Sequence, residues 1–352
     1  MNKLIEIINS SNYQIFFLCV DKFLNINLPD LKNFYSITAP DDIKNSGQLL
    51  SSKIKEMQSK YPSLPIAVMP FKPSAKIDFL SKKYNFALIA NNSKINRLLE
   101  DKIKFYKFCQ KHRLPVIKSY IDIFNQNNFE KYSKGKTLVI QSHFGWAGNS
   151  TFSANSFDNI KDKIIKNSLV KYSPLLDGYS LTNNCCLTRF GLIQSPPALQ
   201  YTGIKPYTNN PFATVGRQWP SFTPPFINKQ IRKITDKFGK IIKKIGYNGY
   251  FGLDFFVVNK KVYLLECNPR LTASFAFYHQ LEERQNLNPL LYFHILEFLN
   301  LNYKINIKKE RKRFENKLIM GSEIIQRNKS NQAIKKINKF EAIVKSCENP
   351  HL

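Results

Sequence analysis

The sequence predicts an α/β protein that combines a parallel sheet near the N-terminus with antiparallel sheets further along the chain. In residues 1–90, short apolar runs alternate with helical patterns, which is typical of a parallel α/β sheet. Between residues 246 and 268, two β-branched and aromatic runs flank a short polar turn, which is typical of a β-hairpin. With 352 residues, 43% of them hydrophobic, the chain is long enough for two or three globular domains.

The N-terminal region contains three apolar runs that we expect to be buried strands, at residues 13–20, 65–69 and 86–90. Between the last two, residues 74–84 follow a helical pattern that begins with the capping residue Ser74. The region lacks a glycine-rich dinucleotide-binding fingerprint. A parallel sheet without that fingerprint is therefore expected.

A single helix is expected from the start signal Asn92-Ser93 to the stop signal Leu114-Pro115, because apolar residues recur at helical spacing between them. Lys102 lies on this helix. As one lysine among many, it is also consistent with an ordinary position on the helix surface.

A glycine-containing loop is expected at residues 142–151, after a strand at residues 137–141. Gly145 and Gly148 would let backbone N–H groups approach an anion closely, so the loop is able to cover the phosphates of a nucleotide. Glycine pairs are equally common in plain turns, so both interpretations stay open. A second hairpin is expected between residues 185 and 195, with its turn at Gly191.

Residues 196–225 are rich in proline, glycine, asparagine, threonine and aromatic residues, which predicts a long loop. We expect this loop to border a substrate site. Arg217 within it is able to hold a carboxylate or a phosphate through two hydrogen bonds, although a surface arginine fits the sequence as well. Residues 226–245 predict an amphipathic helix with a structural role, and residues 287–300 predict a further apolar helix.

The hairpin near residue 260 carries two carboxylates. If residues 259–261 form a three-residue turn, Val258 faces Val262 and Asp254 lies opposite Glu266. Directly opposed like charges are destabilising, so we expect a cation to bridge them. Alternation places Asn268 on the same face, and these oxygens suit a hard divalent cation such as Mg2+, with Mn2+ as an alternative. A solvated strand face is the competing interpretation.

The same residues resemble a known family. Gly-Tyr-x-Gly-x-x-Gly-x-Asp254-Phe, followed by Leu-Leu-Glu266-x-Asn268-Pro-Arg270, is similar to the metal-binding end of the ATP-grasp superfamily of carboxylate-amine and carboxylate-thiol ligases. The resemblance implies a Rossmann-like N-terminal domain in residues 1–90. It further implies an ATP-grasp domain with two subdomains in residues 91–300, and it leaves residues 301–352 as a basic C-terminal segment.

The resemblance also implies roles for individual residues. Asp254, Glu266 and Asn268 would bind the metal, while Arg270 would bind phosphate oxygens or a substrate carboxylate, with Arg217 as a second catalytic candidate. The residues expected to bind the nucleotide are Lys102, Gln141, Gly145, Gly148, Lys171, Tyr172, Asp177 and Ser180.

Two of these positions depart from the family pattern. Gln141 stands where the family usually has a lysine, and Ser180 stands where many relatives carry a ribose-binding glutamate. Asp177 is the expected substitute for that glutamate, although Asp177-Gly178 is also a simple turn signal. The departures keep open a protein that binds ATP without turning it over.

The formal charge of +28 is the strongest compositional feature. Such a balance is typical of proteins with an anionic partner, but the lysines run along the whole chain and no RRM, zinc-finger or helix-turn-helix signature is present. Nucleic acid is therefore a minor alternative, and an acidic partner for the basic run 308–313 is another. The absence of a long apolar run or a signal-peptide pattern makes a cytoplasmic protein without a membrane partner the default expectation.

Together these observations predict an ATP- and Mg2+-dependent ligase that forms a carbon–nitrogen bond. The γ-phosphate of ATP would pass to the carboxylate of a small molecule or peptide, and an amine or other nucleophile would attack the resulting acyl phosphate. A non-catalytic ATP-binding protein and a basic nucleic-acid-binding protein are the alternatives.

Overall fold

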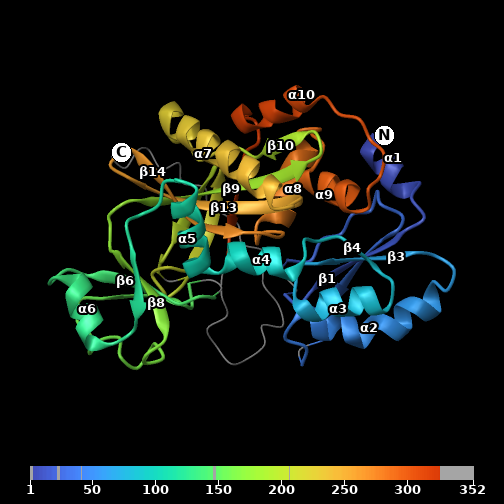
Figure 1. Ribbon diagram of the computed structural model, residues 1–352. Coiled ribbons are helices and arrows are strands. Elements are labelled where there is room, and N and C mark those ends of the chain that lie inside the picture. Colours follow the sequence, from blue (N-terminus) through green and yellow to red (C-terminus); the bar gives the residue numbers. More distant parts are fainter. Residues whose placement is uncertain (1–2, 22–23, 41, 146–147, 206, 326–352) are drawn as a thin grey trace.

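The computed structural model describes residues 3–21, 24–40, 42–145, 148–205 and 207–325. Within these ranges the strands form three sheets: a parallel four-stranded sheet, a central seven-stranded sheet and a second four-stranded sheet. Figure 1 shows the parallel sheet at one end of the molecule and the second four-stranded sheet at the other, with the central sheet between them. The predicted α/β class with antiparallel sheets is confirmed.

The parallel sheet has the strand order β2-β1-β3-β4 and is Rossmann-like. Its strands are β1 (Gln14–Cys19), β2 (Phe34–Thr38), β3 (Ile66–Pro70) and β4 (Ala87–Leu88), and its helices are α1 (Lys3–Asn9), α2 (Ser46–Lys60) and α3 (Ala75–Lys83). The three predicted strands and the helix capped by Ser74 are confirmed. Sequence analysis did not identify β2, whose residues are only partly buried and lack a continuous apolar run.

The central sheet has the order β14-β13-β9-β11-β12-β15, and β10 pairs with β9. Its strands are β9 (Tyr179–Thr188), β10 (Gly191–Gln194), β11 (Ala198–Thr202), β12 (Thr214–Trp219), β13 (Gly249–Val258), β14 (Lys261–Asn268) and β15 (Gly321–Ile324). The expected long loop at residues 196–225 is therefore wrong, because it contains β11 and β12. Its prolines and glycines lie mostly at the strand ends, while Val215 and Trp219 are buried like ordinary strand residues.

The second hairpin is present as β9 and β10, but its turn differs from the expected one. Thr188 pairs with Gly191, so Arg189 and Phe190 form the turn, and Gly191 begins the returning strand. Gly191 has a φ of 137°, which residues with a side chain rarely adopt. A glycine is therefore needed at the first residue of β10.

The predicted single helix between residues 92 and 114 is two helices, α4 (Ser93–Glu100) and α5 (Lys102–Lys111). The side chain of Asp101 caps α5 by accepting hydrogen bonds from the backbone N–H groups of Ile103 and Lys104, both at 3.0 Å. An aspartate that caps a helix has extended backbone torsions, so it ends the preceding helix. The apolar periodicity continues across the break and hides it in the sequence.

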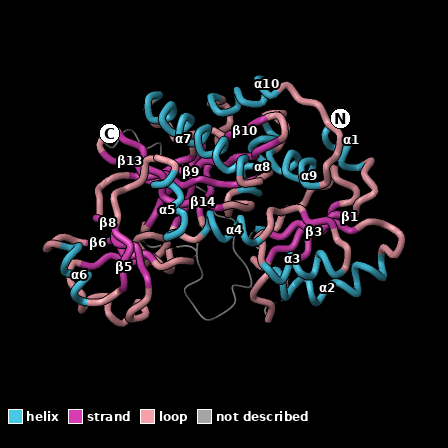
Figure 2. Tube along the Cα trace, viewed as in Figure 1, coloured by secondary structure: helices cyan, strands magenta, loops and turns pink. Residues whose placement is uncertain are grey.

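The amphipathic helix α7 (Pro225–Lys244) covers one face of the central sheet, as Figure 2 also shows. Ile227, Ile231, Phe238 and Ile242 on its apolar side join the core formed by β13 and β14. The predicted helix and its structural role agree with this arrangement. The apolar helix predicted at residues 287–300 is α9 (Leu290–Phe298), which packs against β9 and β13.

The second four-stranded sheet has the order β5-β8-β6-β7 and carries helix α6 (Gln126–Ser133). Its strands are β5 (Tyr120–Ile123), β6 (Leu138–Gln141), β7 (Thr151–Ala154) and β8 (Leu169–Pro174). The glycine-containing loop connects β6 to β7, and residues 146–147 of that loop lie outside the described residues.

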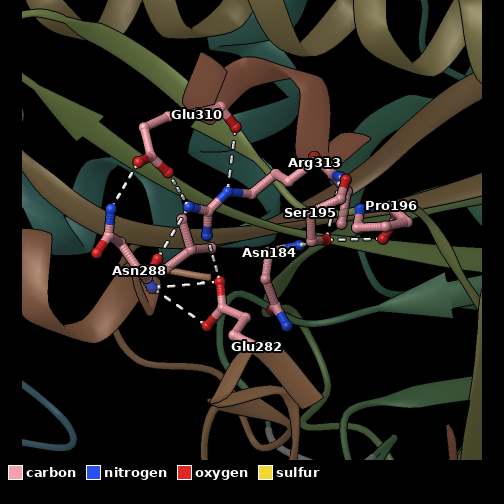
Figure 3. A network of polar contacts seen from close by, with 9 residues as sticks. Asn184, Ser195, Pro196, Glu282, Asn288, Glu310 and Arg313 are labelled. Atoms are coloured by element: carbon pink, nitrogen blue, oxygen red, sulfur yellow. Dashed lines mark hydrogen bonds and ion pairs between the residues drawn. The ribbon is translucent and has the colours of Figure 1, made fainter. Parts of the chain in front are cut away.

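The C-terminal part is tied to the rest of the protein by a buried polar network, which Figure 3 shows in close view. Helices α8 (Phe275–Arg284) and α10 (Ile307–Arg311) and the 3-10 helix η2 (Lys312–Glu315) meet there. Arg313 donates to Glu282 at 2.5 Å and pairs with Glu310, and it donates to the Asn288 carbonyl at 2.9 Å. Arg313 is therefore a buried structural residue, and the basic run at residues 308–313 is not a uniform surface patch.

The final described strand, β15, pairs with β12, so residues 321–324 belong to the central sheet. Residues 326–352, which make up the rest of the expected basic C-terminal segment, lie outside the described residues. Across the described ranges, none of the helices combines the length and the apolar character that crossing a membrane would require.

Candidate active site

The hairpin formed by β13 and β14 places the two carboxylates in register, but by a different route from the predicted one. Val258 pairs with Lys261, so the turn contains only Asn259 and Lys260, both with positive φ values of 47° and 64°. The predicted three-residue turn is wrong. A β-bulge then shifts the register between Asp254 and Phe255, and Asp254 pairs with Glu266 as predicted.

The bulge decides which face Glu266 occupies. Val262 and Leu264 are buried in the core beneath α7, and strict alternation would carry Glu266 to that same face. Phe255 pairs with Leu264 while Asp254 pairs with Glu266, so Leu265 is the extra residue. Cys267 then takes the core face, and Glu266 and Asn268 line a cavity on the other face.

The carboxylate of Asp254 is held by two amides. Gln200 on β11 donates a hydrogen bond to its Oδ1 at 2.9 Å, and Asn268 donates to its Oδ2 at 3.3 Å. Burial raises the pKa of Asp254 well above its usual range, and the neighbouring Glu266 carboxylate raises it further. Asp254 is therefore the carboxylate of the pair that retains a proton more readily.

Glu266 has the opposite environment. Burial alone would raise its pKa, but the Lys102 ammonium, whose Nζ lies 3.1 Å from Oε2, and the hydrogen bond with Asp254 lower it overall. Two neighbouring carboxylates thus have pKa values shifted in opposite directions, which is frequent at functional sites.

Lys102 reaches the carboxylates because it is the first residue of α5. Its backbone N–H donates to the His143 carbonyl at 2.9 Å, and its Nζ donates to the Gly145 carbonyl at 3.3 Å. Lys102 is buried, so the surface interpretation of this lysine is wrong. The Asp101 cap also contacts His143, with 2.8 Å between Oδ2 and Nδ1, and sequence analysis identified neither residue.

A second buried lysine lies in the β5–β8 sheet. Lys171 on β8 pairs in register with Gln141 on β6, and both line the cavity. Burial lowers the pKa of Lys171 to about 8, with the nearby Lys102 ammonium lowering it further and Glu266 opposing the shift. An ammonium group is therefore available directly opposite Gln141, the position where the family usually has its lysine.

The cavity has a volume of about 1510 Å³ and lies between the central sheet and the β5–β8 sheet. It brings together most of the residues singled out from the sequence: Lys102, Gln141, Gly145, Gly148, Lys171, Ser180, Arg217, Asp254, Glu266, Asn268 and Arg270. These residues come from widely separated parts of the chain, so their meeting depends on the tertiary fold.

Two expected nucleotide-binding residues do not line the cavity. Tyr172 alternates with Lys171 along β8, so its side chain is buried on the opposite face, where its hydroxyl donates to the Ile123 carbonyl at 3.1 Å. Asp177 is exposed, and the cavity is lined instead by its neighbours Leu176 and Gly178. Both departures from the family pattern, Gln141 and Ser180, line the cavity.

Both candidate catalytic arginines line the cavity and already have partners. Arg270 donates to Glu100 at 3.1 Å and to the Asn268 Oδ1 at 3.2 Å, and its guanidinium lies over the Phe71 ring. Arg217 donates to Glu323 at 2.6 Å. Sequence analysis missed Glu100 and Glu323, because an isolated glutamate carries no pattern that relates it to an arginine far away in the chain.

The donor set of this site suits a divalent cation in part. Asp254 and Glu266 offer carboxylate oxygens, but the Asn268 oxygen faces Arg270 and its NH2 group faces Asp254, so coordination by Asn268 requires its amide to turn over. Neither here nor elsewhere in the described residues is a group of three or more acidic, histidine or cysteine side chains arranged to hold a metal ion, so a cation here would take its remaining ligands from the Asn268 amide, water or phosphate oxygens.

Comparisons with known proteins agree on the fold. The model described as ATP-grasp domain matches residues 99–274, which is half of the chain. No curated protein matches the sequence. The structure is similar to that of biotin carboxylase from Campylobacter jejuni in its β,γ-ATP complex, with a TM-score of 0.65 and 12% identity over 89% of this chain and 74% of that chain.

Two further solved structures have a similar fold. Carboxyaminoimidazole ribonucleotide synthase from Aspergillus clavatus, complexed with ATP, has a TM-score of 0.59 and 13% identity over 84% of this chain and 78% of its own. The N5-carboxyaminoimidazole ribonucleotide synthetase from Thermotoga maritima has a TM-score of 0.56 and 16% identity over 83% of this chain and 76% of its own. With the sequence motif, the cavity and the matched domain in agreement, the chain belongs to the ATP-grasp family.

Proposed function

We propose that this protein is an ATP- and Mg2+-dependent ligase that activates a carboxylate as an acyl phosphate for attack by an amine. The observation that carries the proposal is the opposed pair Asp254 and Glu266, half-buried at the wall of a cavity of about 1510 Å³. A cavity of this size accommodates a nucleotide together with a second substrate. Family membership supports the proposal.

The carboxylate pair fits a divalent cation on chemical grounds. Two half-buried like charges repel each other, and this repulsion adds to the desolvation that raises the pKa of Asp254, so a cation between them would remove it. Mg2+ is held by a few protein carboxylates together with phosphate oxygens and water, which suits a site with two carboxylates; Mn2+ would fit the same ligands. When bound, the ion neutralises the charge of the polyphosphate during transfer.

The two buried lysines would bind the phosphates. Lys102 reaches both the Glu266 carboxylate and the Gly145 carbonyl, so it connects the carboxylate pair to the glycine-containing loop. Lys171 adds an ammonium on the β5–β8 sheet and takes over the role expected at Gln141. Ser180, which lines the cavity, is a better candidate than the exposed Asp177 for contact with the ribose.

In the proposed reaction, an oxygen of the substrate carboxylate bonds to the γ-phosphorus of ATP while the bond to the bridging oxygen breaks and ADP leaves. The amine then bonds to the acyl carbon, inorganic phosphate leaves and the amine loses a proton. Little covalent chemistry falls to the protein, whose residues position the reactants and stabilise charge. Arg270, fixed by Glu100 and Phe71, would hold a phosphate or carboxylate oxygen in a set orientation.

The proposal is tested by trapping the acyl phosphate with hydroxylamine. The protein would be incubated with Mg2+, ATP, hydroxylamine and pools of amino acids, dicarboxylates or short peptides, and both ADP and hydroxamate would be measured. An active pool should release ADP and hydroxamate in equal amounts, and Asp254→Asn should abolish both. The ligase proposal fails if no pool yields hydroxamate while ATP binds.

A non-catalytic ATP-binding protein is the second candidate, and the uncharged Gln141 is the observation that favours it. In that case, calorimetry would detect ATP binding that depends on Lys171, with no release of ADP in the presence of any carboxylate. The buried Lys171 opposite Gln141 argues for the ligase, because the charge missing from one strand is present on its neighbour.

A further inference from the structure

The cavity contains a second pair of opposite charges, Arg217 and Glu323. Only Arg217 lies within the segment that matches the ATP-grasp model. Arg217 on β12 and Glu323 on β15 are directly opposed in the central sheet, with 2.6 Å between Nη1 and Oε1. Their side chains are only 10% and 16% exposed, and both line the cavity. Glu323 lies beyond residue 274, where the match to the family model ends.

Joining β15 to the sheet does not require this ion pair. Backbone pairing already connects the two strands from Gly216 to Trp219, and an apolar cross-strand pair would avoid the desolvation of two charges. Arg217 also uses little of its hydrogen-bonding capacity, because its Nε and Nη2 have no hydrogen-bond partner within the described residues. The arginine is therefore able to accept a further anionic group.

The charge balance of the cavity differs from that of the chain. Among the residues that the structure describes, its lining includes five acidic and four basic side chains: Asp21, Glu100, Asp254, Glu266 and Glu323, with Lys102, Lys171, Arg217 and Arg270. The whole chain has 25 acidic and 53 basic residues. The acidic enrichment indicates that the cavity binds cationic groups as well as the anionic phosphates.

We propose that Arg217 and Glu323 bind the two charged ends of a zwitterionic substrate, an α-amino acid or a compound with an ammonium group equally close to its carboxylate. The carboxylate would bind Arg217 and the ammonium would bind Glu323. This inference rests on the proposed function and names the class of carboxylate that the ligase activates.

The physical reason is the balance of charges around Arg217. A zwitterion whose carboxylate binds Nε and Nη2 of Arg217 and whose ammonium binds Glu323 pairs every charge at this largely buried site. A simple carboxylate would instead place two anionic groups on one guanidinium and leave one negative charge uncompensated, which is unfavourable for a poorly solvated charge. Selectivity thus arises from the penalty imposed on the competing ligand.

The order of the strands also orients such a substrate. Gln200 on β11 donates to Asp254 and is directly opposed to Arg217, which in turn is opposed to Glu323. Arg217 therefore lies between the Asp254 side of the cavity and Glu323. The carboxylate end of the zwitterion would face the predicted site of phosphoryl transfer, and the ammonium end would face away from it.

The test compares matched pools in the hydroxylamine assay. One pool contains the standard L-α-amino acids, and the other contains the corresponding α-hydroxy acids, which keep the carboxylate and replace the ammonium by a neutral hydroxyl group. The wild-type protein should form at least about tenfold more hydroxamate from the amino acids, since a desolvated charge pair contributes that much or more. Glu323→Gln should bring the ratio close to one.

The control variant is Glu315→Gln, which removes a carboxylate that pairs with Arg232 on the surface outside the cavity. It should keep the wild-type ratio. The melting temperature of each variant shows whether β15 remains folded, and the pool comparison on the wild-type protein needs no variant at all.

The inference is overturned if the α-hydroxy acids are activated as well as the amino acids, or if Glu323→Gln keeps the wild-type preference. It is also overturned if neither pool is active while dicarboxylates or peptides from the first assay yield hydroxamate, in which case the ligase proposal stands. Absence of hydroxamate from every carboxylate would instead overturn the ligase proposal, and the inference with it.

Discussion

The Nζ of Lys102 lies 3.1 Å from the Oε2 of Glu266, although the two residues are separated by 164 positions in the chain. This ion pair joins the start of α5 to the hairpin that carries both carboxylates. It explains why Glu266 stays ionised beside Asp254, whose own pKa is raised. Of the two carboxylates, Glu266 is therefore the one that more readily carries the negative charge needed to bind a cation.

Replacing Glu266 with Gln should reduce ATP turnover on the order of 100-fold or more, because a metal ion contributes several kcal/mol of charge stabilisation to such transfers. The protein should stay folded with a lowered unfolding midpoint, because the substitution relieves the repulsion with Asp254 but leaves the buried Lys102 ammonium without its carboxylate partner. ADP release and the thermal unfolding midpoint would be measured together. Normal turnover in this variant would exclude Glu266 as a metal ligand.

The second prediction concerns the pH dependence of ATP binding. Burial lowers the pKa of Lys171 to about 8, so this lysine loses its proton above that pH in the free protein. A bound polyphosphate favours the charged form, so ATP binding must take up a proton at higher pH. The dissociation constant should rise up to about tenfold per pH unit above pH 8.

Calorimetry between pH 7 and 9.5 would measure this dependence, and buffers with different ionisation enthalpies would reveal the proton uptake. Lys171→Arg keeps its charge over the whole range and should flatten the profile. An unchanged slope in the arginine variant would show that another group titrates.

The third prediction concerns stability at mildly acidic pH. Burial lowers the pKa of His294 to about 3, and its Nδ1 accepts a hydrogen bond from the Tyr250 backbone N–H at 3.0 Å. The unfolded chain binds the proton near pH 6.5 and the folded one does not, so the contribution of neutral His294 is fully present above pH 6.5. It is lost as the pH falls from 6.5 towards 3.

The loss amounts to about 1.4 kcal/mol per pH unit over that range for a single group. Urea unfolding at pH 7.0, 6.0 and 5.0 would measure it. His294→Gln removes the titrating group, so the fall in unfolding free energy between pH 7 and pH 5 should be smaller by about 1.4 kcal/mol per pH unit. This difference does not depend on how stable the variant is at pH 7. The same slope in both proteins would contradict the assignment.

The fourth prediction separates the buried arginine from its basic neighbours. Arg313→Met leaves the buried Glu282 without its charged partner, so the free energy of unfolding should fall by about 3–5 kcal/mol. Lys308→Gln and Lys312→Gln alter exposed side chains in the same run and should each change it by less than about 0.5 kcal/mol. Denaturant unfolding of the three variants would test this contrast, and equal effects would mean that Arg313 is not the structural member of the run.

The sequence by itself determined the elements whose pattern is local. Three strands of the parallel sheet (β1, β3 and β4), the amphipathic helix α7 and the hairpin with its Glu-x-Asn-Pro-Arg string all follow from periodicity, turn signals and a specific motif. The metal-site candidates could be predicted because cross-strand pairing within one hairpin depends on few residues. Even there, the two-residue turn and the bulge at Leu265 compensated for each other, so the predicted pairing was correct although the predicted turn was wrong.

Only the tertiary structure decided which distant residues meet. The break at Asp101, which places Lys102 beside Glu266, is hidden by an apolar period that continues through both helices. The exclusion of Tyr172 from the cavity depends on which face of β8 is buried, and the pairing of Arg217 with Glu323 depends on a strand contributed from a hundred residues later. Such contacts depend on packing between elements, and packing energy is a property of the folded arrangement that no local pattern records.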